Sequence, residues 1–199
     1  MKVKIELLSD AIFGSGQSIP GGEDIAVLHD SYGFPYISGS SVKGVLREEM
    51  ENYFLWTQET GPSRRIQEIF GYAGDKSDLN KMDEEQGGRL TVSDFMLPLK
   101  VRRAVAEELG IQDGDAKQQN VDGVLELFTN IRTFTRIEDG RSREGSLRNA
   151  RCVRKGWIFE GEILCREEDE ELVKECLSYV KGLGTMRTRG FGNVIVKGV

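Results

Sequence analysis

The residues best suited to chemistry lie near the C-terminus, in the segment 182–192, GLGTMRTRGFG. This segment holds four glycines and two arginines and no acid. Glycine lets the backbone approach a ligand closely because it lacks a Cβ atom, and bare N–H groups beside guanidinium groups bind phosphate. We therefore predict a phosphate-binding surface here, with a structural turn as the alternative. The residues expected to bind are Gly182, Gly184, Arg187, Arg189, Gly190 and Gly192.

Two other nucleotide-binding patterns fit this segment poorly. A dinucleotide-binding loop follows a strand and opens a helix, whereas this segment follows a predicted helix and precedes a short predicted strand, 193–197. The run RGFGN also resembles the signature of the RNA recognition motif. In that module the signature lies on an inner strand, where its aromatic side chains stack on bases.

A second group of candidates opens a predicted helix with the sequence SGSSVKGVLREEM, residues 38–50. Lys43 and Arg47 lie one turn apart, away from the apolar face. Cations in a first turn oppose the helix dipole, and a phosphate bound at that N-terminus would remove the conflict. We expect Lys43 and Arg47 to bind phosphate, or else to pair with glutamates of the same helix. Ser40 or Ser41 is expected to cap the helix and to be a further phosphate contact.

Basic charge is concentrated locally, although the chain carries 27 Lys and Arg against 33 Asp and Glu, a net charge of −6. Residues 140–156 include one acid, Glu144, and six basic residues: Arg141, Arg143, Arg148, Arg151, Arg154 and Lys155. A charge run is typical of a solvated face, but two basic segments in glycine-bearing loops favour a polyanionic partner. Arg148 and Arg132 are the candidate contacts, and Phe134 could stack on a base or pack in the core.

Composition excludes several classes of protein. No apolar run approaches the roughly 20 residues that a membrane span needs, and no signal peptide is visible, so we expect a cytoplasmic protein. The three cysteines form no CxxC pair and are expected to be reduced thiols. A His-rich metal site is impossible because His29 is the single histidine.

The order of predicted elements indicates the fold. Period-two alternation predicts strands, and apolar residues at helical spacing predict helices that start near Ser40 and within the acidic run 167–171. Gly182 is expected to end the second of these helices. The predicted strands are 2–8, 25–29, 89–96, 131–137, 157–165 and 193–197, and further short helices are predicted at 64–70 and 102–108. This is an α+β, ferredoxin-like βαββαβ plan in a single domain, 1–199, with insertions at about 72–88 and 99–156.

Three segments together resemble the RAMP superfamily of CRISPR systems, and most closely the backbone-type subunits of type III effector complexes. They are PYISGSSVKGVLR at 35–47, GSLRNAR at 145–151 with GWIFEGEI at 156–163, and the glycine-rich segment 182–192. The resemblance extends over nearly the whole chain and is weakest at 72–88 and 99–128. It implies a ferredoxin-like core with a thumb-like hairpin, an RNA-binding role along guide CRISPR RNA, and assembly with copies of itself and with other RAMP subunits.

The same resemblance implies a catalytic aspartate that cleaves target RNA. The matching position is Asp24, followed six residues later by Asp30, which would be structural in a turn. Glu23 departs from the family pattern because it adds charge beside Asp24. A lone carboxylate could position a divalent cation, Mg²⁺ or Mn²⁺, or orient the attacking 2′-hydroxyl, and the fold needs no cofactor.

Three alternatives remain open at the level of sequence. The chain could be a non-catalytic structural RAMP subunit, with the same RNA surface and no chemistry. It could be a guide-processing endoribonuclease, which would depend on His29 as its base. It could also be a small ferredoxin-like protein that binds a mononucleotide or metabolite.

Overall fold

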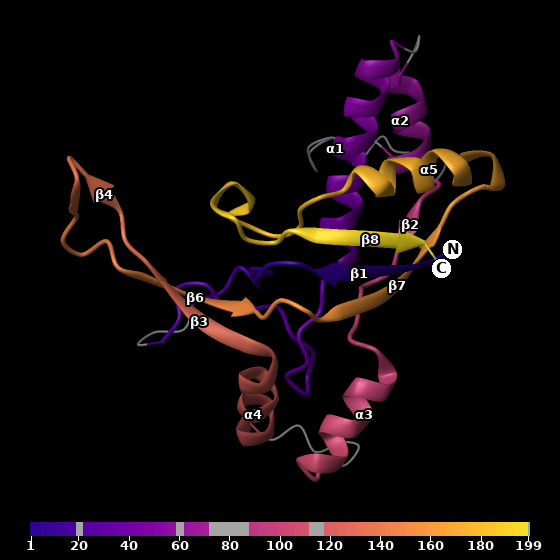
Figure 1. The fold of residues 1–199 in the computed structure, drawn as a ribbon. Helices are drawn as coiled ribbons and strands as arrows, with labels where there is room; N and C mark the ends of the chain where they lie inside the picture. The colour runs from indigo at the N-terminus through magenta and orange to yellow at the C-terminus, as the bar shows by residue number, and fades with distance from the viewer. Residues whose placement is uncertain (19–21, 59–61, 72–87, 112–117, 199) are drawn as a thin grey trace, which may run out of the picture.

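The computed structural model describes residues 1–18, 22–58, 62–71, 88–111 and 118–198. Its main sheet has four strands in the order β2-β7-β1-β8, and every neighbouring pair is antiparallel. These strands are β1 (Lys2–Leu7), β2 (Thr91–Val92), β7 (Ile158–Leu164) and β8 (Val194–Gly198). Helix α1 and the shorter α2 lie between β1 and β2, and α5 lies between β7 and β8, so the topology is the ferredoxin-like plan, as predicted (Figure 1).

Alternation along the strands explains which face of the sheet is covered. In β1, Val3, Ile5 and Leu7 are buried while Lys2 and Lys4 are exposed. Helices α1 (Gly39–Thr57) and α5 (Glu167–Tyr179) pack on the buried face in one continuous apolar core. The α1 residues in this core recur at helical spacing: Val42, Leu46, Met50 and Phe54.

The residue that caps the start of α1 differs from the prediction. Ser38 is the N-cap, and its side-chain oxygen accepts a hydrogen bond from the Ser41 backbone N–H at 3.2 Å. Ser40 and Ser41, the predicted caps, instead place their hydroxyls 2.7 and 3.1 Å from the Ser38 hydroxyl. Position 39, the first of the helix, requires glycine because a Cβ there would lie 2.3 Å from the Val92 carbonyl oxygen. The missing side chain therefore allows β2 to approach the start of the helix closely.

The acidic run does begin α5, as predicted, with four acids in the first turn where they favour the helix dipole. The expected stop at Gly182 is wrong. The helix ends at Tyr179 because Val180 is already extended, with φ −65° and ψ 107°. Gly182 instead forms a bridge with Asn193.

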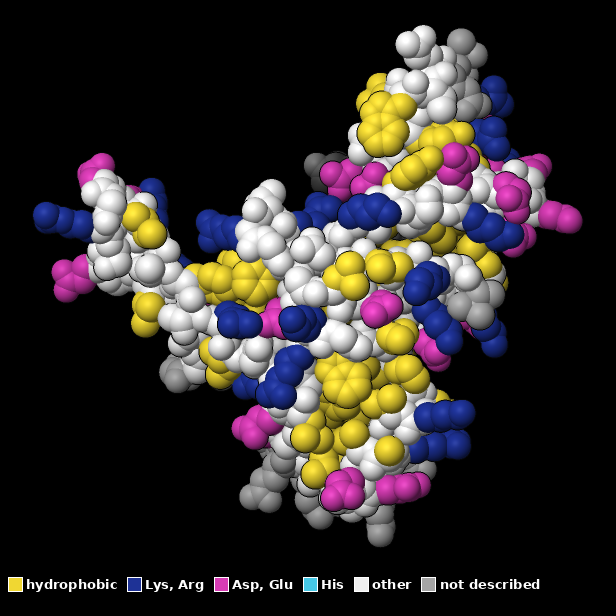
Figure 2. All heavy atoms as spheres, in the orientation of Figure 1, with side chains coloured by type: hydrophobic (Ala, Val, Ile, Leu, Met, Phe, Trp, Pro, Cys, Tyr) yellow, Lys and Arg dark blue, Asp and Glu magenta, His cyan; other side chains and the backbone are white. Residues whose placement is uncertain are grey.

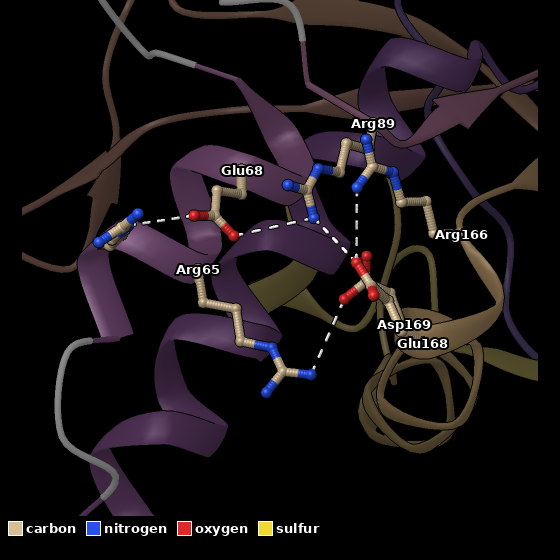
Figure 3. A network of polar contacts seen from close by, with 7 residues as sticks. Arg65, Glu68, Arg89, Arg166, Glu168 and Asp169 are labelled. Atoms are coloured by element: carbon tan, nitrogen blue, oxygen red, sulfur yellow. Dashed lines mark hydrogen bonds and ion pairs between the residues drawn. The ribbon is translucent and has the colours of Figure 1, made fainter.

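Helix α2 (Pro62–Phe70) and the segment before β2 are held against the start of α5 by a network of ion pairs (Figure 3). Arg89 lies 3.0 Å from Glu168 and 3.8 Å from Glu68, and Arg65 lies 3.8 Å from the buried Asp169. Arg166 completes the network at 3.6 Å from Glu168. We call these six residues the α2–α5 network.

The predicted strand 89–96 is shorter than expected, because only Thr91–Val92 pairs regularly with β7. Beyond it, Phe95 bridges Ile37 and Met96 bridges Glu160, so the chain changes partner. Of the predicted insertion 72–88, only Gly88 lies within the described residues.

Between β2 and β7 the described residues form two helices and a long hairpin. Helices α3 (Leu99–Glu108) and α4 (Gln118–Phe128) come first. The hairpin, called the thumb here, pairs β3 (Thr129–Phe134) with β6 (Arg148–Val153). It continues through a smaller pair, β4 (Ile137–Glu138) with β5 (Arg141–Ser142). Figure 1 shows the thumb projecting away from the main sheet.

The predicted strand 25–29 is an irregular arm that contacts two parts of the molecule. Its residues form single bridges, Ile25 to Ala150 of the thumb and Val27 to Gly14, and His29 bridges Pro35.

No described helix is long and apolar enough to cross a membrane.

Candidate nucleic-acid interface

The glycine-rich segment doubles back on itself before β8. Leu183 donates its N–H to the Gly192 carbonyl at 2.8 Å, and Thr185 donates to the Ile12 carbonyl at 3.0 Å. Gly192 has φ +68°, and a Cβ there would lie 1.9 Å from the Leu183 carbonyl oxygen. Gly184 has φ +86°, and its Cβ would lie 2.5 Å from the Ile12 carbonyl oxygen. Part of the glycine content therefore serves the fold itself.

The tip of the segment is more open. Residues Arg187–Arg189 form a single 3-10 turn, η3, between two left-handed residues, Met186 at φ +58° and Gly190 at φ +85°. Left-handed backbone at a non-glycine residue such as Met186 costs on the order of 1 kcal/mol. A Cβ at Gly190 would meet nothing within 4 Å. The tip separates two grooves of the surface.

The first groove, which we call the thumb groove, has a volume of about 790 Å³. It is lined by Phe134, Thr135, Arg136, Ile137, Arg143, Glu144, Gly145, Ser146, Arg148, Met186 and Arg189. Four of these side chains are cationic and one is anionic, so the groove has a surplus of positive charge. Figure 2 shows Lys and Arg side chains near the base of the thumb and over the loop before β8.

Two features of the thumb groove suit RNA. Phe134 packs edge-on against Phe191, with ring centroids 5.5 Å apart, so a strand of the thumb is held against the C-terminal loop. Arg189 has no side-chain ion pair within the described part of the chain. Arg136 and Arg143 share one acid, Glu138, at 2.9 and 3.3 Å. The groove therefore offers the guanidinium group of Arg189, and two arginines that share one acid, beside an aromatic ring, which is the chemistry of single-strand binding.

The second groove, the helix groove, lies on the other side of the tip and has a volume of about 410 Å³. Its lining combines the first turns of α1 with the C-terminal loop: Ile12, Phe13, Gly14, Leu28, Ser38, Ser41, Gly44, Val45, Glu48, Gly184, Thr185 and Arg187. Its two charges form a pair, because an Arg187 nitrogen lies 3.4 Å from a Glu48 oxygen. The start of α1 and the glycine-rich segment thus meet, as the sequence suggested.

Lys43 and Arg47 line neither groove, and Arg47 pairs with a glutamate of its own helix, which was the alternative expectation. Lys43 Nζ donates to the Leu90 carbonyl at 2.8 Å, and its pKa is lowered by burial and by the nearby Arg47 charge. Arg47 donates to the Gly71 carbonyl at 3.3 Å and pairs with Glu51. Positions 43 and 47 lie about a third of a turn around the helix from 41, 44 and 48, and their hydrogen bonds to Leu90 and Gly71 show that they face the β2 side of α1.

Arg132 lies on the thumb strand β3 and is held by Asp10. The Asp10 carboxylate accepts from Arg132 at 2.7 Å, from Asn130 at 3.2 Å and from the Lys155 backbone N–H at 3.0 Å. Burial raises the pKa of Asp10, but these hydrogen bonds outweigh it, and the pKa lies below its ordinary value of 3.8. Arg132 is exposed on its other side and does not line either groove.

Asp24 lies at the base of the thumb, next to the thumb groove. One of its oxygens accepts from the Asn149 N–H at 2.7 Å, and the other lies 3.6 Å from Arg148. Its side chain is 39% exposed. The neighbouring Glu23 is buried and forms an ion pair with Arg151. The extra charge that Glu23 brings to the sequence is therefore neutralised inside the chain.

The two other titratable residues of the arm lie at its far end. Asp30 accepts from the Tyr32 and Phe34 N–H groups at 2.9 and 3.0 Å and pairs with Arg102 of α3, so it orders the turn. The exposed His29 contacts the Asp30 carbonyl through Nδ1 at 2.7 Å and lines neither groove.

Among the described residues, no three His, Cys, Asp or Glu side chains are grouped to hold a metal ion. Two carboxylates lie at the thumb groove, Glu144 in its lining and Asp24 beside it. A divalent cation there would take most of its ligands from phosphate oxygens and water, which is a usual arrangement for Mg²⁺. The cysteines are free, and burial raises the pKa of Cys152 to about 11 and of Cys176 to about 12, so both are unreactive thiols.

Several groove residues were not predicted from the sequence. Glu48, Met186, Arg136 and Arg143 line the grooves without having been candidates. The helical period carried a usable signal for Glu48, because positions 41, 44 and 48 share one face. No sequence pattern indicated that Met186 would adopt a left-handed conformation.

The fold and the surface together define a ferredoxin-like domain with a projecting hairpin and a cationic groove at its base. The family model described as "RAMPs: RAMP superfamily" matches residues 4–195. The chain therefore belongs to the RAMP superfamily, as its motifs indicated.

Individual relatives agree with this assignment. The CRISPR system Cms endoribonuclease Csm3 of Methanothermobacter thermautotrophicus is 26% identical over 192 residues, covering 90% of this chain and 74% of the relative. A chain of the type III-B Cmr-beta complex in its apo state superposes with a TM-score of 0.65 at 15% identity, covering 98% of this chain and 95% of the other.

A second solved structure, type III-B Cmr-beta bound to cognate target RNA, gives a TM-score of 0.63 at 17% identity. The match covers 99% of this chain and 58% of that longer chain. At these identities the two solved structures establish the fold.

Proposed function

We propose that the protein is an RNA-binding subunit of a type III CRISPR effector complex that holds guide RNA along its sugar-phosphate backbone. The observation that carries this proposal is the thumb groove, where arginines of the thumb and Arg189 of the C-terminal loop line one cavity. Membership of the RAMP superfamily and the names of the relatives supply the type of complex. Its partners are guide RNA, target RNA, copies of itself and other RAMP subunits.

The binding mode follows from the charges. Guanidinium groups contact phosphates in any sequence, which suits a guide of variable sequence. The tip at residues 186–190 lies between the two grooves, so a strand that crosses it would contact both. Phe134 is half-buried against Phe191, and its groove-facing edge can contact a base that is splayed from the strand.

Measurements of RNA affinity test this proposal. The purified protein should bind a 30-nucleotide RNA far more tightly than a mononucleotide, and its affinity should fall steeply as salt rises, because phosphate contacts release counterions. Equal affinity for a mononucleotide and for long RNA, without a salt slope, would favour a metabolite-binding protein instead.

We further propose that Asp24 takes part in cleavage of target RNA. Its carboxylate is partly exposed and lies 3.6 Å from Arg148, which lines the thumb groove. It would accept the proton of a 2′-hydroxyl as the 2′-oxygen bonds to phosphorus and the bond to the 5′-oxygen breaks. The leaving 5′-oxygen would take its proton from water. A Mg²⁺ or Mn²⁺ ion bound by Asp24 and by phosphate oxygens would stabilise negative charge on the phosphoryl group.

Replacement of the acid tests the catalytic proposal. Asp24→Asn should lower target cleavage by the assembled complex by about 10²-fold or more while RNA affinity and assembly stay unchanged. Glu144→Gln, at another acid beside the groove, is the matched control and should cleave normally. Normal cleavage by Asp24→Asn would reject the role of Asp24.

A non-catalytic subunit is the second candidate, and one observation favours it. Asp24 already accepts a backbone hydrogen bond and faces a cation, which is how a structural acid is bound. For a subunit of this kind, wild-type complexes would bind target RNA without cutting it beside this chain. The guide-processing alternative depends on His29, and unchanged processing by His29→Ala would reject it.

A further inference from the structure

The helix groove holds a carboxylate where a phosphate-binding surface would favour cations only. Glu48 and Arg187 pair at 3.4 Å on the groove wall, and both side chains are about half exposed. The charges of the pair cancel, so this groove differs from the thumb groove with its surplus of arginine. The carboxylate calls for a ligand group other than phosphate.

Gly44 indicates that the groove is kept open for something outside the chain. Glycine within a helix is destabilising relative to alanine, and Gly44 lies within α1. A Cβ at Gly44 would meet nothing within 4 Å, so no contact of the described chain requires the missing side chain. Gly39 and Gly184 differ, because backbone oxygens lie where their Cβ atoms would be.

The chemistry of an RNA strand limits what Glu48 can bind. An ionised carboxylate only accepts hydrogen bonds, and a phosphate diester also only accepts. The donors of RNA are the ribose 2′-hydroxyl and the base N–H groups. Among the described residues, Phe13 is the one aromatic residue that lines the helix groove, and it is only 5% exposed and packs against Phe159, so it offers little surface for a base to stack on. A ribose fits this lining better than a base.

We propose that the helix groove receives one ribose of the bound RNA, with Glu48 accepting a hydrogen bond from its 2′-hydroxyl and Arg187 contacting an adjacent phosphate. Glu48 is then a specificity residue that distinguishes RNA from DNA. This inference rests on the proposed RNA-binding function.

The decisive experiment compares the affinities for a 30-nucleotide RNA and for DNA of the same sequence. The wild type should prefer RNA by about tenfold, the effect of one hydrogen bond to a charged group. Glu48→Gln keeps a side-chain oxygen that accepts and should keep most of the preference. Glu48→Leu removes the acceptor and should bind RNA and DNA about equally. Glu51→Leu, on the same helix but outside the groove, is the matched control.

Each outcome has a distinct meaning. Failure of the wild type to bind RNA would reject the proposed function itself. An unchanged RNA preference in Glu48→Leu would overturn the ribose site alone. Equal tightening of RNA and DNA binding in both Glu48 variants would also overturn it, because it would show that Glu48 only masks Arg187. A preference that follows base identity rather than 2′-deoxy substitution would assign Glu48 to a base.

A second variant tests the space that the ribose would occupy. Gly44→Ala adds one methyl group to the groove and should raise or maintain the melting temperature, because alanine favours helix. RNA affinity should fall by several-fold. Gly123→Ala is the control, because Gly123 is also helical with open space at its Cβ and lines neither groove. Unchanged RNA affinity in Gly44→Ala would contradict the proposal.

Discussion

The α2–α5 network and the thumb groove use arginine in opposite ways. In the network, Arg65, Arg89 and Arg166 lie within 3.8 Å of acids of the same chain, and the pairs join two helices and the start of β2 (Figure 3). In the thumb groove, Arg136 and Arg143 share a single acid, Arg148 faces Asp24 at 3.6 Å, and Arg189 has no ion pair among the described residues. Arginine that is compensated within the chain serves the fold, whereas a surplus left beside a cavity is available to a polyanion. Substitutions in the two regions should therefore affect different measurements.

The glycine-rich segment contains residues that serve the fold as well as residues that are open to a ligand. Substitution of its glycines should give the largest change in stability. Gly192→Ala places a Cβ 1.9 Å from the Leu183 carbonyl oxygen at φ +68°, and should lower the free energy of unfolding by about 3 kcal/mol or more. Gly190→Ala has left-handed backbone but open space and should cost about 1 kcal/mol. Urea unfolding measures both. Equal costs would show that backbone conformation alone decides the effect.

Removal of two arginines from the thumb groove should give the next largest effect, a loss of RNA affinity. Arg148→Ala combined with Arg189→Ala should weaken RNA binding by about 100-fold near 0.1 M salt, because each phosphate contact contributes on the order of 1–2 kcal/mol. The slope of log affinity against log salt should fall by about 1.4, the value for two contacts with single-stranded RNA. Stability should stay within about 0.5 kcal/mol of the wild type. Loss of stability together with unchanged affinity would contradict the comparison.

The network supplies the reciprocal test. Arg89→Ala leaves Glu68 and Glu168 without their shared partner and should lower the free energy of unfolding by about 1 kcal/mol, because networked pairs contribute more than isolated surface pairs. RNA affinity should not change. A clear fall in RNA affinity in this folded variant would place RNA contacts outside the two grooves.

Replacement of Asp10 should give the smallest effect, a change in how stability depends on pH. Its folded pKa lies below 3.8, so the stability that it contributes is complete above that value and is lost as the pH falls through the lowered folded pKa. Asp10→Asn should remove this part of the acid dependence and lower stability at neutral pH by less than about 1 kcal/mol. Urea unfolding at several pH values between 2 and 7 measures it. If stability depended on pH in the same way in Asp10→Asn as in the wild type, Asp10 would not be a source of the acid dependence.

The elements that local patterns determine were predictable from the sequence. Alternation from Trp157 to Cys165 predicts β7, and the apolar spacing from Val42 to Phe54 predicts α1, because one face of each must be buried. The resemblance identified the family. The βαββαβ plan was also predicted, from the order of the elements along the chain.

Contacts between distant segments were not predictable. Lys43 and Arg47 turn towards the carbonyls of Leu90 and Gly71, and no local pattern shows that those backbone oxygens lie beside the helix. The Glu23–Arg151 and Arg132–Asp10 pairs each join residues more than a hundred positions apart. Their geometry depends on the packing of the thumb against the segment after β1 and against the arm, which no local sequence pattern indicates.

The path of the RNA is the central claim, and photo-cross-linking tests it most directly. RNA that carries 4-thiouridine would be irradiated in complex with the protein, and the adducts would be located by mass spectrometry. Adducts should fall on residues 134–148 and 184–191, at the thumb groove and the tip between the grooves. Adducts confined to the exposed face of β1 and β7, with none at these segments, would contradict the account.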